Sequence, residues 1–260
     1  MAQRMVVVTG GSSGIGRAAV RLVAETGIPV AVLDADGAGA EQAAAEAVAA
    51  GAPDAAGFRC DVTDEPSVRH AVAEAVRRFG EPPTGLLAAA GIDINGPAHR
   101  LALADWARVL DVNLTGAYLA ARTVIATMLD TGVAGSLVLC SSPAALVAFA
   151  AGGTSAYAAS KGGVSALMRS LAIDYAPSGI RVNAILPGPT ETPLMWASVP
   201  EAERAVMREQ LCAEVPLGRI ADPVEPARAA LWLLGPDSSY VTGSQLVCDG
   251  GVLAKSSVSV

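Results

Sequence analysis

Short runs of apolar residues alternate with longer amphipathic stretches along this 260-residue chain. The short runs are almost continuously apolar, which is typical of parallel strands that are buried on both faces. We therefore expect a sheet of seven parallel strands. The predicted strands are Met5–Thr9, Val30–Asp34, Gly57–Asp61, Leu86–Ala90, Ser136–Ser141, Arg181–Leu186 and Gln245–Cys248.

The stretches between these runs have helical periodicity. After the third strand, Thr63 or Asp64 can cap a helix on which Val68, Val72 and Val76 recur at every fourth position. The other predicted helices are Arg17–Thr26, Gly39–Ala50, Leu103–Leu129, Ser155–Tyr175 and Pro223–Leu234. Alternating strands and helices predict an α/β fold, a doubly wound parallel sheet with helices on both faces.

Composition and charge narrow the classes of partner. The chain is 52% hydrophobic, and its 25 acidic residues outnumber its 18 basic ones. An acidic surface repels nucleic-acid phosphates and anionic lipids, so we expect no nucleic-acid or membrane partner. The uncharged stretch 131–160 is longer than the ~20 residues of a membrane-spanning helix. Its serines, glycines and Pro143 divide it into a strand, a polar loop and the start of a helix.

Cysteine and histidine usage indicates a compartment and excludes one kind of site. The four cysteines form no C-x-x-C pair, and the first residues lack the apolar stretch and cleavage site of a secretory signal. We therefore expect free thiols and a cytoplasmic location. Two histidines, His70 and His99, are too few for a three-histidine zinc site, so no metal is expected.

A glycine-rich loop, "TGGSSGIG" at residues 9–16, joins the first predicted strand to the first helix. Gly10, Gly14 and Gly16 permit a tight turn, close approach to a pyrophosphate and close packing of helix on strand. Asp34 ends the second strand, where a carboxylate can bind both ribose hydroxyls and repel a 2′-phosphate. These features predict NAD(H) rather than NADP(H). The alternative is that Asp34 only begins the turn "DADG".

Tyr157 and Lys161 are four residues apart on a predicted helix and are therefore neighbours on one face. A cation ~4 Å from the phenol, at an effective dielectric constant of ~20, is worth ~4 kcal/mol. That energy would lower the phenol pKa by about 3, toward the range where acid–base catalysis is efficient. Burial acts in the opposite direction. We expect the lysine to lower the pKa of Tyr157.

Taken together and in order, the motifs "TGGSSGIG", "CDVTD", "AAAG", "VNLTG", "YAASK", "ILPGPTETP" and "YVTGSQLVCDGG" resemble the short-chain dehydrogenase/reductase family. The resemblance implies one Rossmann domain over residues 1–260, with a substrate lid at about 189–218. It implies an NAD(H)-dependent oxidoreductase that interconverts a secondary alcohol and its ketone. It also implies a homotetramer.

The resemblance assigns roles by position. Tyr157 would be the acid–base residue and Lys161 its partner, Ser142 would hold the reacting oxygen, and Asn113 would hold a water. Ser142 precedes Tyr157 by more than the usual family spacing, so Ser141 is the alternative. The implied cofactor-binding residues are Gly10, Ser12, Ser13, Gly14, Ile15, Gly16, Asp34, Asp61, Val62, Ala90, Gly91, Tyr157, Lys161, Pro187, Gly188, Thr190 and Thr192.

Two further expectations concern the sheet and the substrate. Ala88 replaces an asparagine that is usual in the family, and we expect this change to affect stability rather than chemistry. The apolar side chains of the lid, with Ile94, Val147 and Phe149, indicate a small alicyclic or hydroxyacyl-type substrate. The alternatives are an NADP(H)-dependent ketone or 3-oxoacyl reductase, a non-redox enzyme on the same fold, and a regulator without redox activity.

Overall fold

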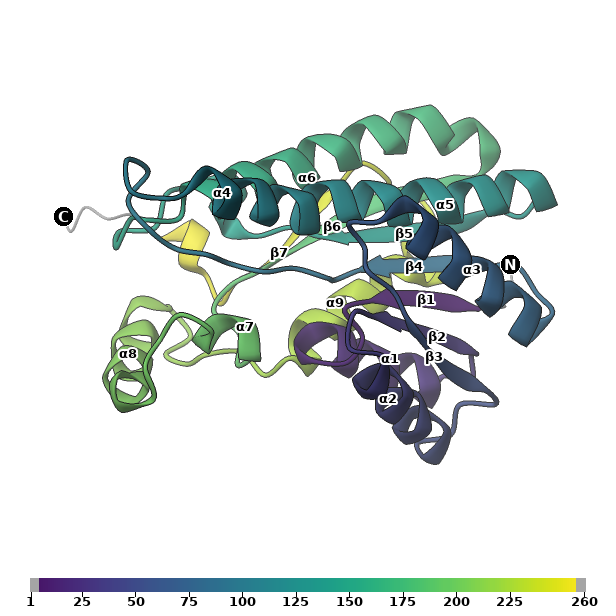
Figure 1. Ribbon diagram of the computed structural model, residues 1–260, viewed down its shortest axis with the longest axis horizontal. Coiled ribbons are helices and arrows are strands. Elements are labelled where there is room, and N and C mark those ends of the chain that lie inside the picture. Colours follow the sequence, from purple (N-terminus) through teal and green to yellow (C-terminus); the bar gives the residue numbers. More distant parts are fainter. Residues whose placement is uncertain (1–4, 256–260) are drawn as a thin grey trace.

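Seven strands form one parallel sheet in the order β3-β2-β1-β4-β5-β6-β7 in the computed structural model, which describes residues 5–255 (Figure 1). The strands are β1 (Val6–Thr9), β2 (Val30–Asp34), β3 (Ala55–Arg59), β4 (Gly85–Ala88), β5 (Gly135–Cys140), β6 (Ile180–Pro187) and β7 (Gln245–Cys248). The order reverses direction at β1, which is the signature of a doubly wound sheet. The predicted fold class is therefore confirmed.

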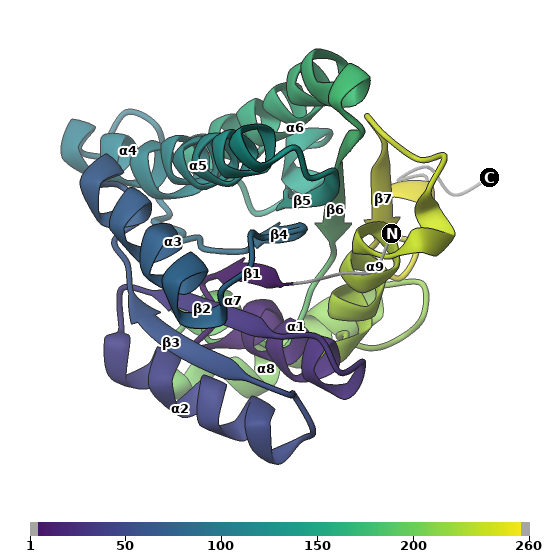
Figure 2. The same ribbon diagram turned by 90° about the vertical axis from the view of Figure 1, so that its right-hand side faces the viewer.

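Helices cover both faces of the sheet (Figure 2). One layer holds α1 (Gly14–Glu25), α2 (Gly37–Ala49) and α9 (Val224–Leu234). The other holds α3 (Glu65–Phe79), α4 (Leu103–Leu110), α5 (Gly116–Thr131) and α6 (Ser155–Tyr175). Two further helices, α7 (Pro193–Trp196) and α8 (Glu201–Glu214), project beyond the carboxyl ends of the strands.

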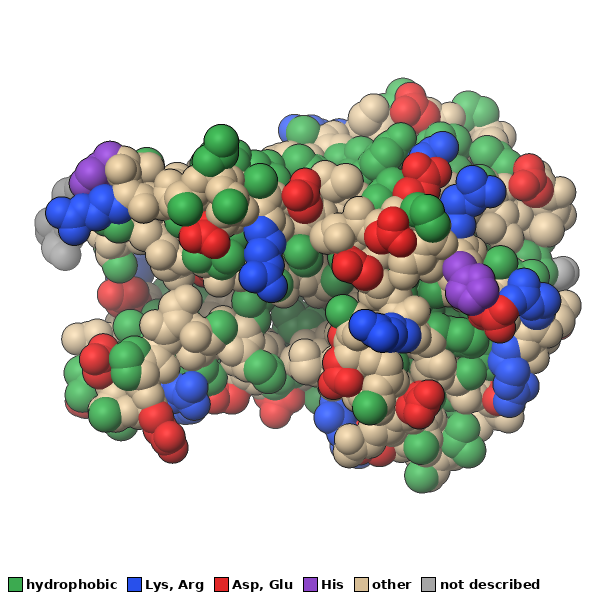
Figure 3. All heavy atoms as spheres, in the orientation of Figure 1, with side chains coloured by type: hydrophobic (Ala, Val, Ile, Leu, Met, Phe, Trp, Pro, Cys, Tyr) green, Lys and Arg blue, Asp and Glu red, His purple; other side chains and the backbone are tan. Residues whose placement is uncertain are grey.

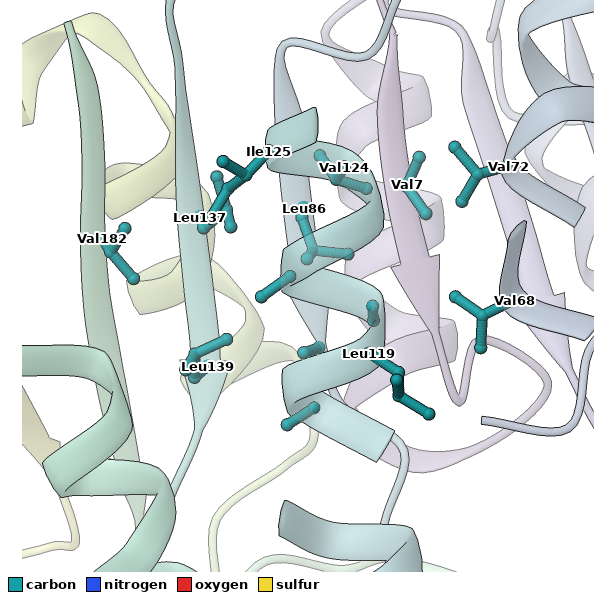
Figure 4. Packing of buried hydrophobic residues seen from close by; sticks show 14 of the residues in the cluster. Val7, Val68, Val72, Leu86, Leu119, Val124, Ile125, Leu137, Leu139 and Val182 are labelled. Atoms are coloured by element: carbon teal, nitrogen blue, oxygen red, sulfur yellow. The ribbon is translucent and has the colours of Figure 1, made fainter. Parts of the chain in front are cut away.

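Alternate side chains along each strand point to opposite faces of the sheet and pack against the two helical layers. Val7, Leu86 and Leu137 point toward α3 and α5, where they pack with side chains such as Val124 (Figure 4). Their strand neighbours, such as Val6, face α1, α2 and α9. Because both faces of the sheet are covered, the strands are apolar at most positions, and each buried valine or leucine contributes ~1.5–3 kcal/mol.

Most element boundaries differ from the predictions by one to three residues, and three differences have a structural explanation. Strand β3 ends at Arg59, because the backbone N–H of Asp61 donates to Ser67 Oγ instead of to the sheet. The helix predicted at 103–129 is interrupted by a π-helical turn, Asp111–Thr115. Helix α8 carries no buried residue, so no apolar stripe predicted it.

The helical run Leu103–Thr131 is the one span among residues 5–255 that is long and apolar enough to cross a membrane. Half of its most apolar part is buried, and Val124, Ile125 and Met128 pack against the sheet. A core helix of a soluble domain has the same character. The uncharged stretch 131–160 divides into β5, a loop and the start of α6, as predicted.

Candidate active site

The candidate residues gather beyond the carboxyl ends of the strands, where parallel α/β sheets bind their ligands. The glycine loop follows β1, and Asp34 ends β2. Residues 89–93 follow β4, and Ser142 follows β5. Because every strand runs in the same direction, motifs that are far apart in the sequence lie close together in space.

The glycine loop is closely packed. Gly10 has a φ of 68°, and a Cβ atom there would lie 2.7 Å from the backbone of Ala90. A Cβ atom on Gly16 would lie 2.1 Å from the carbonyl oxygen of Gly10. A Cβ atom on Gly14 would lie 3.1 Å from the side chain of Thr192. The loop exposes Ser13, and helix α1 begins directly after it, so this cradle fits a pyrophosphate.

The Asp34 carboxylate faces the glycine loop. Its Oδ2 atom accepts hydrogen bonds from Ser12 N at 3.0 Å and from Ser12 Oγ at 2.7 Å. Its Oδ1 atom accepts from Asp36 N at 3.0 Å, which is the turn contact of the alternative interpretation. The turn bond uses one lone pair of Oδ1, so the carboxylate retains acceptor capacity for a ribose hydroxyl.

Asp61 and Val62 lie just beyond β3, one strand further from the glycine loop than Asp34. Asp61 Oδ1 accepts from both the N–H and the hydroxyl of Thr63, and these bonds lower the pKa of Asp61. Val62 is buried, and a Cβ atom on Gly116 would lie 2.7 Å from its side chain. Of the two predicted caps of α3, Asp64 is the one that accepts from Ser67 N.

Lys161 and Tyr157 lie on one face of α6, as predicted. The ammonium nitrogen of Lys161 lies 5.5 Å from the centroid of the Tyr157 ring and donates to the carbonyl oxygen of Cys140 at 2.8 Å. Lys161 is buried, and burial lowers its pKa. The first turns of α6 thus hold a phenol and an amine together in a protected site.

The predicted lowering of the Tyr157 pKa is wrong for the protein in this form. Burial raises the pKa of Tyr157 well above its usual value, and the nearby Cys140 and Asp93 add to the rise. A hydrogen bond with Ser142 acts in the other direction but is smaller. The ammonium of Lys161 is directed to the Cys140 carbonyl, and it does not outweigh the cost of placing a phenolate in a buried site.

The two adjacent serines point to different neighbours. Ser142 Oγ interacts with the phenol of Tyr157 and accepts from Ala144 N at 3.2 Å. Ser141 Oγ instead donates to the carbonyl oxygen of Lys161 at 3.0 Å and lies 2.8 Å from Ser165 Oγ. The longer spacing to Tyr157 is taken up by the loop before α6, so Ser142 is the serine beside the phenol.

Asn113 occupies the π-helical turn and is buried. Its Oδ1 atom accepts from Ile92 N at 2.8 Å, while its Nδ2 atom donates to Ile92 O at 2.9 Å and to Ser160 Oγ at 3.0 Å. Ser160 in turn donates to the carbonyl oxygen of Tyr157. This network joins the loop after β4 to helix α6, and π turns of this kind often mark functional sites.

Sequence reasoning did not identify two of these partners, Ser160 and the carbonyl of Cys140. Ser160 precedes Lys161 within "YAASK", so its place in that motif was the available signal. The contribution of Cys140 is a backbone oxygen, and a backbone oxygen carries no residue-specific pattern.

The segment after β6 crosses the site and leads to α7. A Cβ atom on Gly188, which follows Pro187, would lie 2.6 Å from the backbone of Asp249. Thr190 donates to the carbonyl oxygen of Gly188 at 2.8 Å, and Thr192 caps α7 by accepting from Met195 N. These contacts hold Thr192 against the glycine loop.

Helices α7 and α8 form one side of a hollow, and Figure 3 shows the molecular surface drawn inward beside them. A cavity of about 460 Å³ is lined by Glu191, Thr192, Pro193, Trp196, Ala197 and Arg204. Glu191 accepts from Trp196 Nε1 at 2.7 Å and forms an ion pair with Arg208, whose guanidinium lies over the Trp196 ring. Arg208 is therefore engaged within the protein.

Comparison with known proteins identifies the family. The family model described as "Enoyl-(Acyl carrier protein) reductase" matches residues 10–253. A cis-4-hydroxycyclohexanecarboxylate dehydrogenase from Sinomonas cyclohexanicum is 42% identical over 97% of this chain and 98% of its own. A 2,5-dichloro-2,5-cyclohexadiene-1,4-diol dehydrogenase from Sphingobium indicum is 37% identical over 96% and 97%, respectively.

Solved structures agree with this result. A short-chain type dehydrogenase/reductase from Mycobacterium marinum superposes with a TM-score of 0.90 at 31% identity, covering 97% of this chain and 96% of that one. The chain belongs to the short-chain dehydrogenase/reductase family. The dehydrogenases of this family use a nicotinamide cofactor and act on a CH–OH group.

Proposed function

We propose that this protein is an NAD(H)-dependent dehydrogenase that interconverts a small, largely apolar alicyclic secondary alcohol and its ketone. The observation that supports this function best is the group formed by half-buried Tyr157 and the buried Ser142 and Lys161, beside a glycine loop whose tight packing excludes side chains. A regulator on this fold would have no need of the phenol and the amine together.

The chain's own residues carry out binding and proton transfer. Ser142 holds the reacting oxygen against Tyr157, whose hydroxyl takes the proton of the alcohol or returns it to the ketone. Lys161 stabilises the phenolate and binds a ribose hydroxyl, and Asn113 fixes the loop at Ile92 and holds a water. A bound nicotinamide supplies the hydride acceptor.

The choice of NAD(H) rests on Asp34. A 2′-phosphate placed there would meet the carboxylate that Ser12 holds at the edge of the glycine loop. Neither Ser13 nor Ala35 offers a positive charge to pair with such a phosphate. Arg17, which donates to the carbonyl oxygen of Ser12, is paired with Glu46. The other proposed cofactor contacts are the glycine loop, Ala90 and Gly91, Asp61 and Val62 at the adenine, and residues 187–192 at the nicotinamide.

The substrate class rests on the hollow and on the relatives. Trp196, Pro193 and Ala197 give the cavity apolar lining, while Glu191, Thr192 and Arg204 give it polar lining. Two relatives are named for alcohols on six-membered carbon rings, one a cyclohexanecarboxylate and one a cyclohexadienediol. We propose one catalytic domain over residues 1–260, with a substrate lid at about 189–218, that acts as a cytoplasmic homotetramer.

The first experiment titrates the purified protein with NADH and NADPH by fluorescence and then screens cyclic alcohols with NAD⁺. We expect NADH to bind at least tenfold more tightly than NADPH. The Tyr157→Phe variant is expected to bind NADH normally and to lose more than a hundredfold of turnover, because it lacks the proton-transferring hydroxyl. Equal or tighter NADPH binding would favour the ketone reductase, and retained turnover in the variant would exclude Tyr157 as the acid–base group.

A further inference from the structure

Asp93 is an acidic residue beside the site to which the proposed reaction gives no role. It follows Ile92, whose N–H and C=O groups are both bound by the Asn113 amide. Two residues earlier, a Cβ atom on Gly91 would lie 3.6 Å from the ammonium nitrogen of Lys161. The backbone is thus fixed as it passes Lys161, and Asp93 is the first ionisable side chain after this crossing.

The Asp93 carboxylate is only partly satisfied. Its Oδ1 atom is buried and has no hydrogen-bond partner within the described structure, while the Asn95 side chain hydrogen-bonds to the carboxylate. Burial raises the pKa of Asp93, while Asn95 and Lys161 favour its charged form. Buried polar atoms in proteins are nearly always paired, so an unpaired carboxylate oxygen requires an explanation.

The position of Asp93 relates this oxygen to the reaction site. The negative charge of Asp93 raises the pKa of both Tyr157 and Lys161, so the carboxylate lies within electrostatic range of the proton-transferring pair. The loop that carries it is tied to the loop before α6 by a hydrogen bond from Gly96 N to Gly153 O at 2.8 Å.

We propose that Asp93 determines substrate specificity by accepting a hydrogen bond from a second hydroxyl group, so that the preferred substrates are neutral cyclic diols. This inference rests on the proposed function. A carboxylate attracts a hydroxyl donor and repels a second carboxylate. Of the two arginines of the lid, Arg208 does not offset this, because it pairs with Glu191. Arg204, which lines the cavity, keeps its charge while it donates to the backbone carbonyls of Val199 and Trp196.

The two relatives differ at the same chemical position. One is named for a 1,4-diol and the other for a 4-hydroxy carboxylate, so both carry a polar group across a six-membered ring from the reacting alcohol. The charge of Asp93 favours the hydroxyl over the carboxylate at that position. The side chain therefore selects between two substrates of nearly the same shape.

The test compares four substrates with NAD⁺: cis-1,4-cyclohexanediol, cis-4-methoxycyclohexanol, cyclohexanol and cis-4-hydroxycyclohexanecarboxylate. The methoxy compound keeps the size of the diol and lacks its second donor. We expect the wild-type kcat/KM for the diol to exceed that for the methoxy compound at least tenfold, mainly through KM, as a charge-assisted hydrogen bond would give. In Asp93→Asn this ratio should fall below threefold, and kcat/KM for the carboxylate should rise at least fivefold.

Controls separate specificity from structure. Asp130→Asn makes the same change of charge at an exposed position at the end of α5 and should leave all four ratios unchanged. Asp93→Ala provides a second variant without the amide. An equal loss on all four substrates, or an unchanged diol preference in both variants, would overturn the inference.

Calorimetry measures diol binding to the protein–NADH complex and therefore tests the role of Asp93 without turnover. We expect Asp93→Asn to weaken diol binding at least tenfold while NADH binding is unchanged. If no alcohol is oxidised but diol binding still depends on Asp93, the specificity assignment stands and the proposed dehydrogenase reaction fails. Equal diol binding by the wild type and Asp93→Asn overturns the specificity assignment.

Discussion

At the scale of single residues, the site places a phenol where its charged form is unfavourable. Tyr157 is half-buried, and this burial raises its pKa; Cys140 and Asp93 raise the pKa further, while Ser142 lowers it. The protonated phenol is a suitable proton donor for ketone reduction. It is a poor proton acceptor for alcohol oxidation until its pKa falls, so the two directions of the reaction place opposite demands on this group.

We expect Tyr157 to remain protonated in the cofactor-free protein through neutral and moderately alkaline pH, because its folded pKa lies above the usual value of ~10. Tyrosinate absorbance, recorded as a function of pH for the wild type and for Tyr157→Phe, measures this directly. The two curves should coincide up to about pH 10. An extra ionisation in the wild type with a midpoint between pH 7 and 9 would show that Lys161 dominates.

The reacting side chains could be identified from the sequence, but the direction in which the pKa of Tyr157 shifts could not. Tyr157, Lys161, Ser142 and Asn113 carry recognisable functional groups at fixed spacings, and the structure brings them together. The direction of the Tyr157 pKa depends on how deeply the ring is buried and on where the Lys161 ammonium points. Both are tertiary properties, and the spacing of two residues on a helix does not determine them.

At the scale of elements, the turn from β1 to α1 depends on the absence of a side chain. A Cβ atom at Gly16 would lie 2.1 Å from the carbonyl oxygen of Gly10, and a backbone oxygen cannot move without displacing the loop. Gly162, in the middle of α6, is a contrasting case, because a Cβ atom there would meet nothing within 4 Å. The same substitution therefore has opposite expected effects at the two positions.

We expect Gly16→Ala to lower the melting temperature and to weaken NADH binding at least tenfold, since α1 must move away from β1. Gly162→Ala, the matched control, should be neutral or stabilising by about 0.5–1 kcal/mol, because alanine favours a helix. Thermal unfolding and fluorescence titration of the two variants check these expectations. Normal NADH binding by Gly16→Ala would mean that the loop tolerates the displacement or that the cofactor lies elsewhere.

At this scale, prediction from the sequence was most accurate for elements whose apolar residues pack against the core. Strand β2 and helix α6 begin and end where predicted, because their apolar residues meet a core. Edge strand β7 also matches its prediction, although only Leu246 and Cys248 pack against the core and both are partly buried. Helix α8 has no buried residue, and the π turn at Asp111–Thr115 replaces a normal helical turn without a break in composition. A pattern of apolar positions cannot reveal elements whose positions are set by something other than the core.

At the scale of the whole molecule, large apolar side chains remain exposed on α2, in the loop before α6, on α8 and in two further regions that bear on assembly. One region lies on α4, α5 and α6 and includes Leu103, Tyr118, Leu129 and Ile173. The other lies on α9 and around the edge strand β7 and includes Trp232, Tyr240 and Val247. An uncovered edge strand and clusters of exposed apolar residues are typical of surfaces that meet another chain.

Two separate apolar regions on one chain suit a tetramer with two kinds of interface, because each closed symmetric contact uses one surface patch of both partners. We therefore expect the purified protein to sediment at about four times the chain mass of 26.1 kDa. Ile173→Glu and Trp232→Glu should each place charges against their copies and reduce the assembly to dimers. Val206→Glu, on the exposed helix α8, is the matched control and should leave the tetramer intact.

Sedimentation velocity at micromolar concentration distinguishes the possible arrangements. Dimers from both single variants, with a monomer from the double variant, would establish two independent interfaces. A wild-type monomer at that concentration would contradict the expectation. It would also mean that the exposed apolar side chains at β7 and on α6 serve another contact, because their burial against a second copy would then not repay the cost of association.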